Sequence, residues 1–234
     1  MSELALSKDT MEVLKNFSTI NSNILIKPGN QLMTMNISKT IVGVATDLVE
    51  EFPAEFPIYN LIEFLSALAL FKDPILDFSD NMVTIKEKSS RGMKVKYMAA
   101  SKAILVYPKN NKVREPDYEV SFNLSAEDLD NLLKSSAVIG APDLEVLGNQ
   151  DGIKIKISNR KLSSKGDETN DVEIIISTDP QPVDYVFYYK IENFKMTPGE
   201  YEVSIGSKGL TRFASTDRKY NIFITNESDS TYGS

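Results

Sequence analysis

The side chains available for chemistry in this 234-residue chain are carboxylates, amines, guanidiniums and hydroxyls, because the sequence contains no His, Cys or Trp. That composition excludes a thiolate nucleophile, a disulfide, an imidazole-ligated metal and a Ser-His-Asp triad. Acidic residues gather in three clusters, which are Glu50-Glu51, Glu127-Asp128-Asp130 and Asp167-Glu168. None of them provides the spaced acid/base pair that carboxylate catalysis requires. We therefore expect no enzymatic activity, no metal and no cofactor.

One glycine-rich stretch is superficially similar to a nucleotide-binding loop. Its sequence is Gly206-Ser207-Lys208-Gly209-Leu210-Thr211, which lacks the Gly-Lys-Ser/Thr order of such loops. The stretch lies between two strand-like segments, so the sequence predicts a hairpin turn here.

The charge balance limits how the chain can interact with nucleic acid. It has 26 Lys and Arg residues against 33 Asp and Glu residues, a formal net charge of -7. This argues against a protein that coats nucleic acid by bulk electrostatics, but not against one that gathers a few basic residues on one surface.

No segment of the sequence indicates export or membrane insertion. The first nine residues have neither a basic lead nor a long apolar stretch. The most apolar run, Leu61 to Phe71, contains Glu63 and is far shorter than the roughly 20 residues of a membrane span. We expect a soluble, intracellular protein.

The first periodic segment predicts an amphipathic helix over Ser7 to Ile20. Met11, Leu14, Phe17 and Ile20 recur at every third position and form an apolar face together with Val13. Lysines and other polar residues occupy the opposite face. Ser7 is a suitable N-cap, and Asp9 places a negative charge in the first turn, where the helix dipole favours it.

The same pattern begins again half a chain later. Leu6 to Leu14 aligns with Leu124 to Leu132, with Leu, Ser and the second Leu identical and the acidic residues conservatively exchanged. Ser125 and Asp128 form a Ser-x-x-Asp capping box. Two further pairs follow in matching order: a Gly-Asn-Gln turn before a strand-like run (Gly29 to Gln31 and Gly148 to Gln150), and short helices predicted at Tyr59–Phe64 and Tyr189–Phe194.

These matches predict an α+β protein with two similar domains, each a helix–strands–helix–strands unit. The polar segment between Pro108 and Pro116 is predicted to be an extended linker. We place the domains at residues 1–108 and 118–234, with a connector over 109–117. Two other polar stretches are predicted to be a hairpin loop (Asn159 to Asp171) and a frayed tail (Asn226 to Ser234).

With the duplication established, the chain resembles the DNA sliding clamps of T-even-type bacteriophages. The resemblance is carried by short strings in the same order along the whole chain. They are Leu6-Ser7-Lys8-Asp9-Thr10 with Leu14-Lys15-Asn16-Phe17, Ala99-Ala100-Ser101-Lys102, Ala126-Glu127-Asp128-Leu129, and Pro198-Gly199-Glu200-Tyr201 with the terminal Glu227-Ser228-Asp229-Ser230-Thr231. No single string is a specific motif.

The resemblance implies a DNA-clamp fold and a homotrimeric ring that encircles double-stranded DNA without reading its sequence. It also implies a phage DNA polymerase as partner, a clamp loader that places the ring on DNA, and a role as anchor for late-gene transcription factors. The site of action would be the cytoplasm of the infected bacterial host. The alternatives are a β-rich phage structural or assembly protein and, more remotely, a carboxylate-only glycosidase.

The implied site residues fall into two groups. DNA-facing candidates are basic residues on or beside the helices, with weaker candidates on strands and loops: Lys8, Lys15, Lys134, Lys190, Lys195, Arg91, Lys94, Lys96 and Lys102. The clamp family also receives partner peptides in an apolar pocket near the connector. Candidates here flank the connector or lie on what we predict to be the final strand: Tyr107, Pro108, Val113, Tyr118, Ile222 and Ile224.

Overall fold

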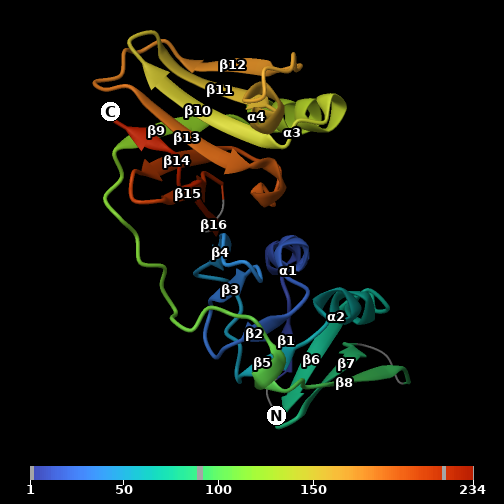
Figure 1. The fold of residues 1–234 in the computed structure, drawn as a ribbon. Helices are drawn as coiled ribbons and strands as arrows, with labels where there is room; N and C mark the ends of the chain where they lie inside the picture. Colours follow the sequence, from blue (N-terminus) through green and yellow to red (C-terminus); the bar gives the residue numbers. More distant parts are fainter. Residues whose placement is uncertain (1–2, 89–91, 218–219, 234) are drawn as a thin grey trace. The chain divides into compact units, whose positions relative to one another are not determined.

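The fold is that of a computed structural model, which describes residues 3–88, 92–217 and 220–233 (Figure 1). The chain divides into two compact units, Met1–Val113 and Arg114–Ser234. The division lies within the range 109–117, where no helix or strand occurs.

The first unit contains two α-helices and three groups of antiparallel strands. The sheets have the orders β1-β6-β7-β8, β2-β5 and β3-β4. Its elements are β1 (Glu3–Ala5), α1 (Lys8–Ile20), β2 (Ile24–Ile26), β3 (Leu32–Met35), β4 (Ile41–Ala45), β5 (Phe56–Ile58), α2 (Leu61–Leu68), β6 (Pro74–Ser79), β7 (Met82–Glu87), β8 (Lys94–Met98) and the 3-10 helix η1 (Lys102–Ile104).

The second unit contains one long helix and two antiparallel sheets. Paired strands follow one another in the orders β12-β11-β10-β13-β17 and β9-β14-β15-β16. Its elements are β9 (Val120–Leu124), α3 (Ala126–Ile139), β10 (Asp143–Asn149), β11 (Gly152–Ser158), α4 (Arg160–Ser163), β12 (Val172–Ser177), β13 (Tyr185–Lys190), η2 (Ile191–Asn193), β14 (Tyr201–Gly206), β15 (Leu210–Ser215), β16 (Tyr220–Thr225) and β17 (Thr231–Tyr232).

The two units repeat one another element by element (Figure 1). The antiparallel run β1-β6-β7-β8 corresponds to β9-β14-β15-β16, and the pairs β2-β5 and β3-β4 correspond to β10-β13 and β11-β12. Helices α1 and α3 occupy the same place in this order. The predicted duplication is therefore confirmed; only α4 and β17 have no counterpart among the described elements of the first unit.

Helix α1 forms where its cap and apolar spacing predict it. The Ser7 hydroxyl accepts a hydrogen bond from the Thr10 amide at 3.1 Å, and the buried face includes Leu14 and Phe17. Phe17 approaches the sheet at Gly43 of β4, where an added Cβ would lie 2.6 Å from the Cε1 atom of Phe17. Only glycine at this position leaves room for the aromatic ring.

Helix α3 repeats the same construction. The Ser125 hydroxyl accepts a hydrogen bond from the Asp128 amide at 3.0 Å and donates one to the Asp128 carboxylate at 2.6 Å. The helix ends at Gly140, whose φ of +66° is left-handed and disfavours side chains with a Cβ. Both Ser7 and Ser125 are N-caps, as predicted; in the predicted capping box, the Asp128 carboxylate accepts from the Ser125 hydroxyl.

Of three predictions about the second unit, two differ from the structure in detail and one is confirmed. The helix predicted at Tyr189–Phe194 is a three-residue 3-10 turn, because Tyr189 and Lys190 continue β13. The loop predicted at Asn159 to Asp171 contains the short helix α4, capped by the Asn159 side chain. The hairpin turn predicted at Gly206 to Thr211 is confirmed, since β14 and β15 pair on either side of it.

Residues 226–233 of the C-terminal tail are ordered, contrary to the predicted fraying, and β16 is not the final strand. Strand β17 pairs with β13, so Tyr232 lies opposite Tyr185 with ring centroids 6.1 Å apart. Before it, the Glu227 amide donates to the Tyr188 carbonyl at 2.8 Å, and the Tyr188 amide donates to the Ser230 hydroxyl at 3.0 Å. Short polar tails lack an apolar period, so this β-pairing leaves no sequence signal.

A buried carboxylate fixes the start of α1. Glu50 is only 5% exposed. It accepts hydrogen bonds from the Thr10 hydroxyl at 2.6 Å and from the Ser7 backbone amide. Burial raises the pKa of Glu50, but the hydrogen bonds from Thr10 and Ser7 outweigh it, so the pKa lies below its ordinary value. The charged form therefore stabilises the folded unit.

We expect Glu50→Gln to lower the free energy of unfolding by about 1–3 kcal/mol at neutral pH, because a charge-assisted hydrogen bond is lost in a buried position. Since folding lowers the pKa of Glu50, its contribution is present above the ordinary pKa of about 4.3 and disappears as the pH falls through the folded value. Urea unfolding at one fixed protein concentration, at pH 7 and near pH 3, measures this.

Glu51→Gln is the matched control, since the neighbouring Glu51 is exposed. A Glu50→Gln variant as stable as the Glu51→Gln variant at pH 7, or equally destabilised at both pH values, would contradict the role assigned to Glu50.

Candidate functional site

The two lysines of α1 lie on the exposed side of the helix, as predicted. Lys8 and Lys15 are both exposed, whereas Val13, Leu14 and Phe17 are buried on the opposite side. Within the described part of the chain neither lysine takes part in an ion pair. Both ammonium groups are available to an anion in solution.

A groove of about 890 Å³ in the first unit brings these lysines together with two that the sequence analysis missed. It lies between α1, α2 and the start of β6, and Lys72 and Lys88 also line it. Apolar side chains, including Leu68, form part of its wall. Lys72 follows α2 and Lys88 follows β7, so no helical spacing in the sequence connects either residue with α1.

The carboxylate of Glu87 holds the backbone beside Lys72. It accepts hydrogen bonds from the Lys72 amide at 3.0 Å and from the Asp73 amide at 2.8 Å. The Lys88 amide donates to the Asp73 carbonyl at 3.3 Å. These bonds place the loop after α2 next to the end of β7, so Lys72 and Lys88 share one rim of the groove.

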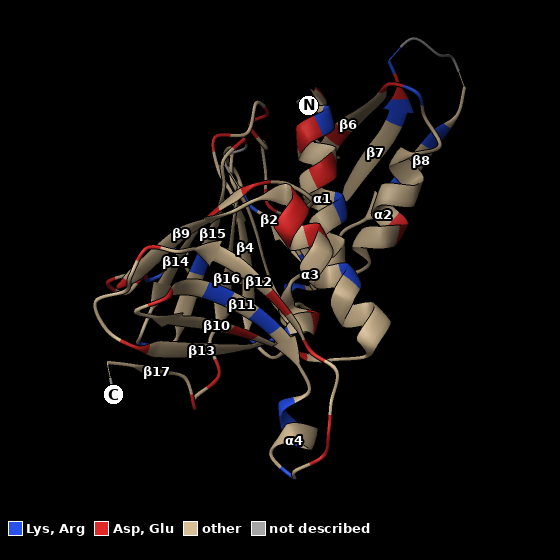
Figure 2. Cartoon of the chain, turned by 90° about the horizontal axis from the view of Figure 1, so that it is seen from above, with Lys and Arg blue, Asp and Glu red and all other residues tan. Residues whose placement is uncertain are grey.

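Two of the predicted basic residues of the second unit form ion pairs, unlike the lysines of α1. The Lys134 ammonium lies 2.6 Å from Asp130 one helical turn earlier, and Lys190 lies 2.5 Å from the buried carboxylate of Asp143. Lys195 is exposed. Figure 2 shows acidic residues gathered at the start of α3, whereas α1 carries both signs of charge.

The remaining basic candidates lie on strands and loops. Lys102 forms an ion pair with Glu55 at 2.8 Å, and this hydrogen bond raises the pKa of Lys102. Lys94 and Lys96 are exposed on β8. Arg91 lies outside the described residues.

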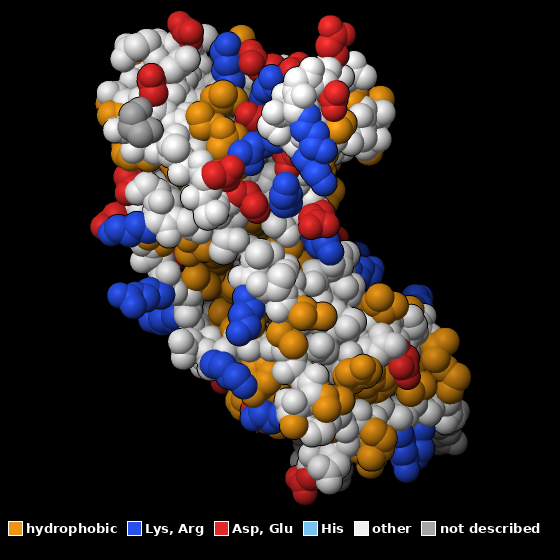
Figure 3. Space-filling view, in the orientation of Figure 1, with side chains coloured by type: hydrophobic (Ala, Val, Ile, Leu, Met, Phe, Trp, Pro, Cys, Tyr) orange, Lys and Arg blue, Asp and Glu red, His pale blue; other side chains and the backbone are white. Residues whose placement is uncertain are grey.

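Exposed apolar side chains gather on and beside α2. Ile62 is 58% exposed and Leu70 is 61% exposed, and Tyr59 precedes the helix with 57% exposure. Figure 3 shows hydrophobic side chains in the lower right, where Figure 1 draws α2 and β8. Such a concentration marks a surface that another molecule can cover.

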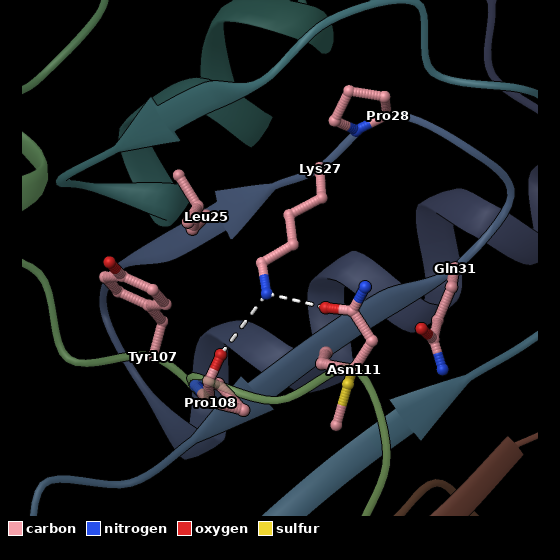
Figure 4. A pocket seen from close by; sticks show the side chains of 8 residues that line it. Leu25, Lys27, Pro28, Gln31, Tyr107, Pro108 and Asn111 are labelled. Carbon is pink, nitrogen blue, oxygen red and sulfur yellow. Dashed lines mark hydrogen bonds between the residues drawn. The ribbon is translucent and has the colours of Figure 1, made fainter.

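Two of the predicted pocket residues line a small pocket in the first unit (Figure 4). Tyr107 and Pro108 meet Leu25 and Lys27 around a volume of about 30 Å³. The Lys27 ammonium donates to the Asn111 side-chain oxygen at 2.7 Å and to the Pro108 carbonyl at 3.5 Å. These bonds hold the start of the connector against the end of β2.

The other four predicted pocket residues lie elsewhere. Val113 is not among the residues that line this pocket. Tyr118 belongs to the second unit, where its hydroxyl donates to Glu115 at 2.7 Å; burial and this carboxylate raise the pKa of Tyr118. Ile222 and Ile224 have no exposed area. These two are core residues of β16, and we leave them out of the pocket.

The described residues contain no group of three or more His, Cys, Asp or Glu side chains that could hold a metal ion. No helix among them is long and apolar enough to cross a membrane.

The fold is the DNA-clamp fold, as two solved structures with little sequence identity show. Proliferating Cellular Nuclear Antigen from Entamoeba histolytica aligns with a TM-score of 0.71 at 10% identity, over 96% of this chain and 98% of that one. The DNA polymerase III subunit beta from Pseudomonas aeruginosa aligns with a TM-score of 0.68 at 11% identity, over 99% of this chain and 66% of that one.

Sequence comparison identifies the family. Residues 7–106 match the family described as "DNA polymerase processivity factor", and residues 121–227 match "gp45 sliding clamp, C terminal". The sliding clamp of Vibrio phage KVP40 is 32% identical over 96% of this chain and 99% of its own length. That of Escherichia phage RB69 is 30% identical over 98% and 99%. The chain belongs to the phage sliding-clamp family of DNA polymerase processivity factors.

Family membership agrees with the functional prediction. The chain is a processivity factor for DNA replication, a class of proteins that act as scaffolds and not as enzymes. The alternatives of a phage structural protein and of a glycosidase are not supported.

Proposed function

We propose that three copies of this chain close into a ring around duplex DNA and thereby tether the phage replicative polymerase to its template. The observation that carries the ring is a pair of exposed terminal strands, β8 in the first unit and β12 in the second. The exposed lysines of α1 would face the enclosed DNA.

Strand β8 forms one edge of a sheet in the first unit. It is the last strand of the sheet β1-β6-β7-β8. Tyr97 points toward α2, where its ring lies 5.1 Å from that of Phe64 in an edge-on arrangement and its hydroxyl donates to the Asn60 carbonyl at 3.0 Å. The other face of β8 exposes the residues that alternate with Val95 and Tyr97, which are Lys94, Lys96 and Met98.

Strand β12 presents a similar edge in the second unit. It is the last strand of its sheet, and its alternate residues Val172 and Ile174 are only half-buried. Ile175 on the other face is 60% exposed, close to Glu173, which pairs with Lys154 at 3.1 Å. A five-residue and a six-residue edge are well matched in length.

Joining β8 of one copy to β12 of the next would satisfy the backbone groups of both edges. It would also continue the half-buried row of Val95 and Tyr97 on β8 into that of Val172 and Ile174 on β12. The contact is head to tail, because it uses different surfaces of the two copies, and such contacts form a closed ring when the rotation suits it. A topological link requires little DNA affinity, which agrees with the net charge of -7.

Other partners follow from the same model. A ring must be opened to enclose DNA, so we include an ATP-driven clamp loader, and we retain late-gene transcription factors as further partners. The protein would act inside the infected bacterium, in its cytoplasm. For the polymerase we assign a peptide-binding role to the pocket at Tyr107 and Pro108.

The central test is primer extension on a long circular template by the phage polymerase and its loader. Addition of the clamp should lengthen the product made in one binding event. Products of unchanged length with an active loader would overturn the proposed function.

Ile175→Lys should weaken the ring, because the new charge would join the lysine row of β8 in the continued sheet. Like charges across a strand pair cost about 0.2–1 kcal/mol, here at each joined edge. Sedimentation equilibrium should show dissociation of a species of three chain masses at higher concentration than in the wild type. Ile175→Glu is the matched control and should leave the ring intact. Equal behaviour of the two variants, with unchanged circular dichroism, would argue against the β8–β12 contact.

Lys8→Glu combined with Lys15→Glu should weaken DNA retention and leave the trimer intact, because both charges are exposed on α1 and belong to neither edge strand. Removing two phosphate contacts lowers the slope of log affinity against log salt by about two units. Titration of labelled duplex at several salt concentrations measures this. Unchanged retention and salt slope would remove both residues from the DNA-facing set.

Tyr107→Ala should reduce binding of a polymerase-derived peptide several-fold, because it removes an aromatic wall of the pocket. Isothermal titration with that peptide is the measurement. Tyr232→Ala serves as a control for loss of an aromatic ring elsewhere in the chain. If Tyr107→Ala binds as tightly as wild type while polymerase stimulation persists, the peptide site lies at another place.

A further inference from the structure

The charges on the two helices that correspond in the duplicated units have diverged. Helix α1 carries two lysines and two acids, Lys8, Asp9, Glu12 and Lys15. Helix α3 carries three acids and one lysine, Glu127, Asp128, Asp130 and Lys134. Helices that share a fold position and a packing role therefore present different potentials to anything that passes both of them.

Ion pairing increases this difference. Within the described residues Lys8, Lys15, Lys72 and Lys88 form no ion pairs, and all four line the same groove. Six charged residues line it, these four lysines and the two acids Glu12 and Asp73. In the second unit the charge of Lys134 is compensated by Asp130 and that of Lys190 by Asp143.

The shape of the groove suits a nucleic acid backbone better than a small anion. Its volume of about 890 Å³ is far larger than a phosphate group needs, and its wall is apolar at Leu65, Leu68 and Phe71. Lysines act as point charges on flexible stems, which attract phosphates without fixing their geometry. The apolar wall and the flexible lysine side chains together allow a nucleic acid strand to lie in the groove and also to move along it.

We propose that the groove between α1, α2 and β6 is the principal phosphate-binding site of this clamp, and that the second unit contributes little to DNA contact. Lys72 and Lys88 are then DNA-contact residues beside Lys8 and Lys15. The inference rests on the proposed function, in which duplex DNA passes these helices. Each copy would hold DNA through one of its two units, so a ring of three would have three attractive sites separated by acidic ones.

The experiment compares two charge reversals of equal size in the full-length protein. One variant is Lys72→Glu with Lys88→Glu in the groove, and the other is Lys134→Glu with Lys195→Glu in the second unit. All four lysines are exposed. Binding of the assembled clamp to a labelled duplex is measured by fluorescence anisotropy over a range of salt concentrations, and primer extension with loader and polymerase is measured in parallel.

We expect the groove variant to lose about tenfold or more in affinity at low salt, with a salt slope smaller by about two units. The variant of the second unit should change less than twofold. In addition, Glu127→Lys with Asp130→Lys should raise affinity and slow movement along DNA, since it converts a repelling segment into an attracting one.

Equal losses in the two lysine variants, or a loss only in the second-unit variant, would overturn the asymmetry. A groove variant that binds like wild type would overturn the assignment of Lys72 and Lys88. In both cases wild-type stimulation of the polymerase keeps the proposed function intact. A wild-type protein that gives no stimulation overturns the proposed function, and this inference with it.

Discussion

Each unit of the chain depends on the burial of one apolar helix face against antiparallel strands. In the first unit, Phe17 lies fully buried against β4, and the sheet admits its ring only because residue 43 is a glycine. In the second unit, Leu129 and Leu132 provide the buried face of α3. Because an amphipathic helix buries one side, its other side must face solvent, and the side chains there are free of packing constraints. This constraint separates the stability of the fold from the charge of its exposed surface.

That separation explains why the two copies could diverge in charge while keeping their order of elements. Exchanges among Lys, Asp and Glu on the outer face of α1 or α3 cost little stability, since surface substitutions generally change it by less than about 0.5 kcal/mol. The Ser caps at positions 7 and 125, by contrast, satisfy backbone amides in both copies. Caps and apolar spacing therefore preserve the evidence of the duplication, whereas the charges on the exposed faces were free to change.

Caps and apolar spacing are also the features from which the sequence predicts the fold. They predicted both long helices, because a cap and an apolar face depend on residues close together in the chain, and their recurrence predicted the repeat. The hairpin at Gly206 to Thr211 was predicted from its place between two strand-like segments. The groove could not be predicted, since Lys72 and Lys88 join Lys8 through loop geometry set by Glu87. Burial of Ile222 and Ile224 was missed for a related reason: an apolar strand at a sheet centre and one beside a pocket have the same alternation. The tail was missed because backbone pairing to β13 needs no apolar pattern.

The acidic net charge of -7 is consistent with a protein that retains DNA by topology. Every phosphate neutralised by a lysine adds affinity through counterion release. A lining that is basic throughout would therefore bind DNA tightly and hinder its movement through the ring. Ion pairs such as Lys134–Asp130 and Lys190–Asp143 keep cations on the second unit without leaving them available to phosphates. In the proposed ring, a few uncompensated lysines would centre the DNA, and the surrounding acids would limit how tightly it is held. Weak attraction at a few places, within a ring that DNA can leave only when the ring opens, would permit both movement along DNA and long residence on it.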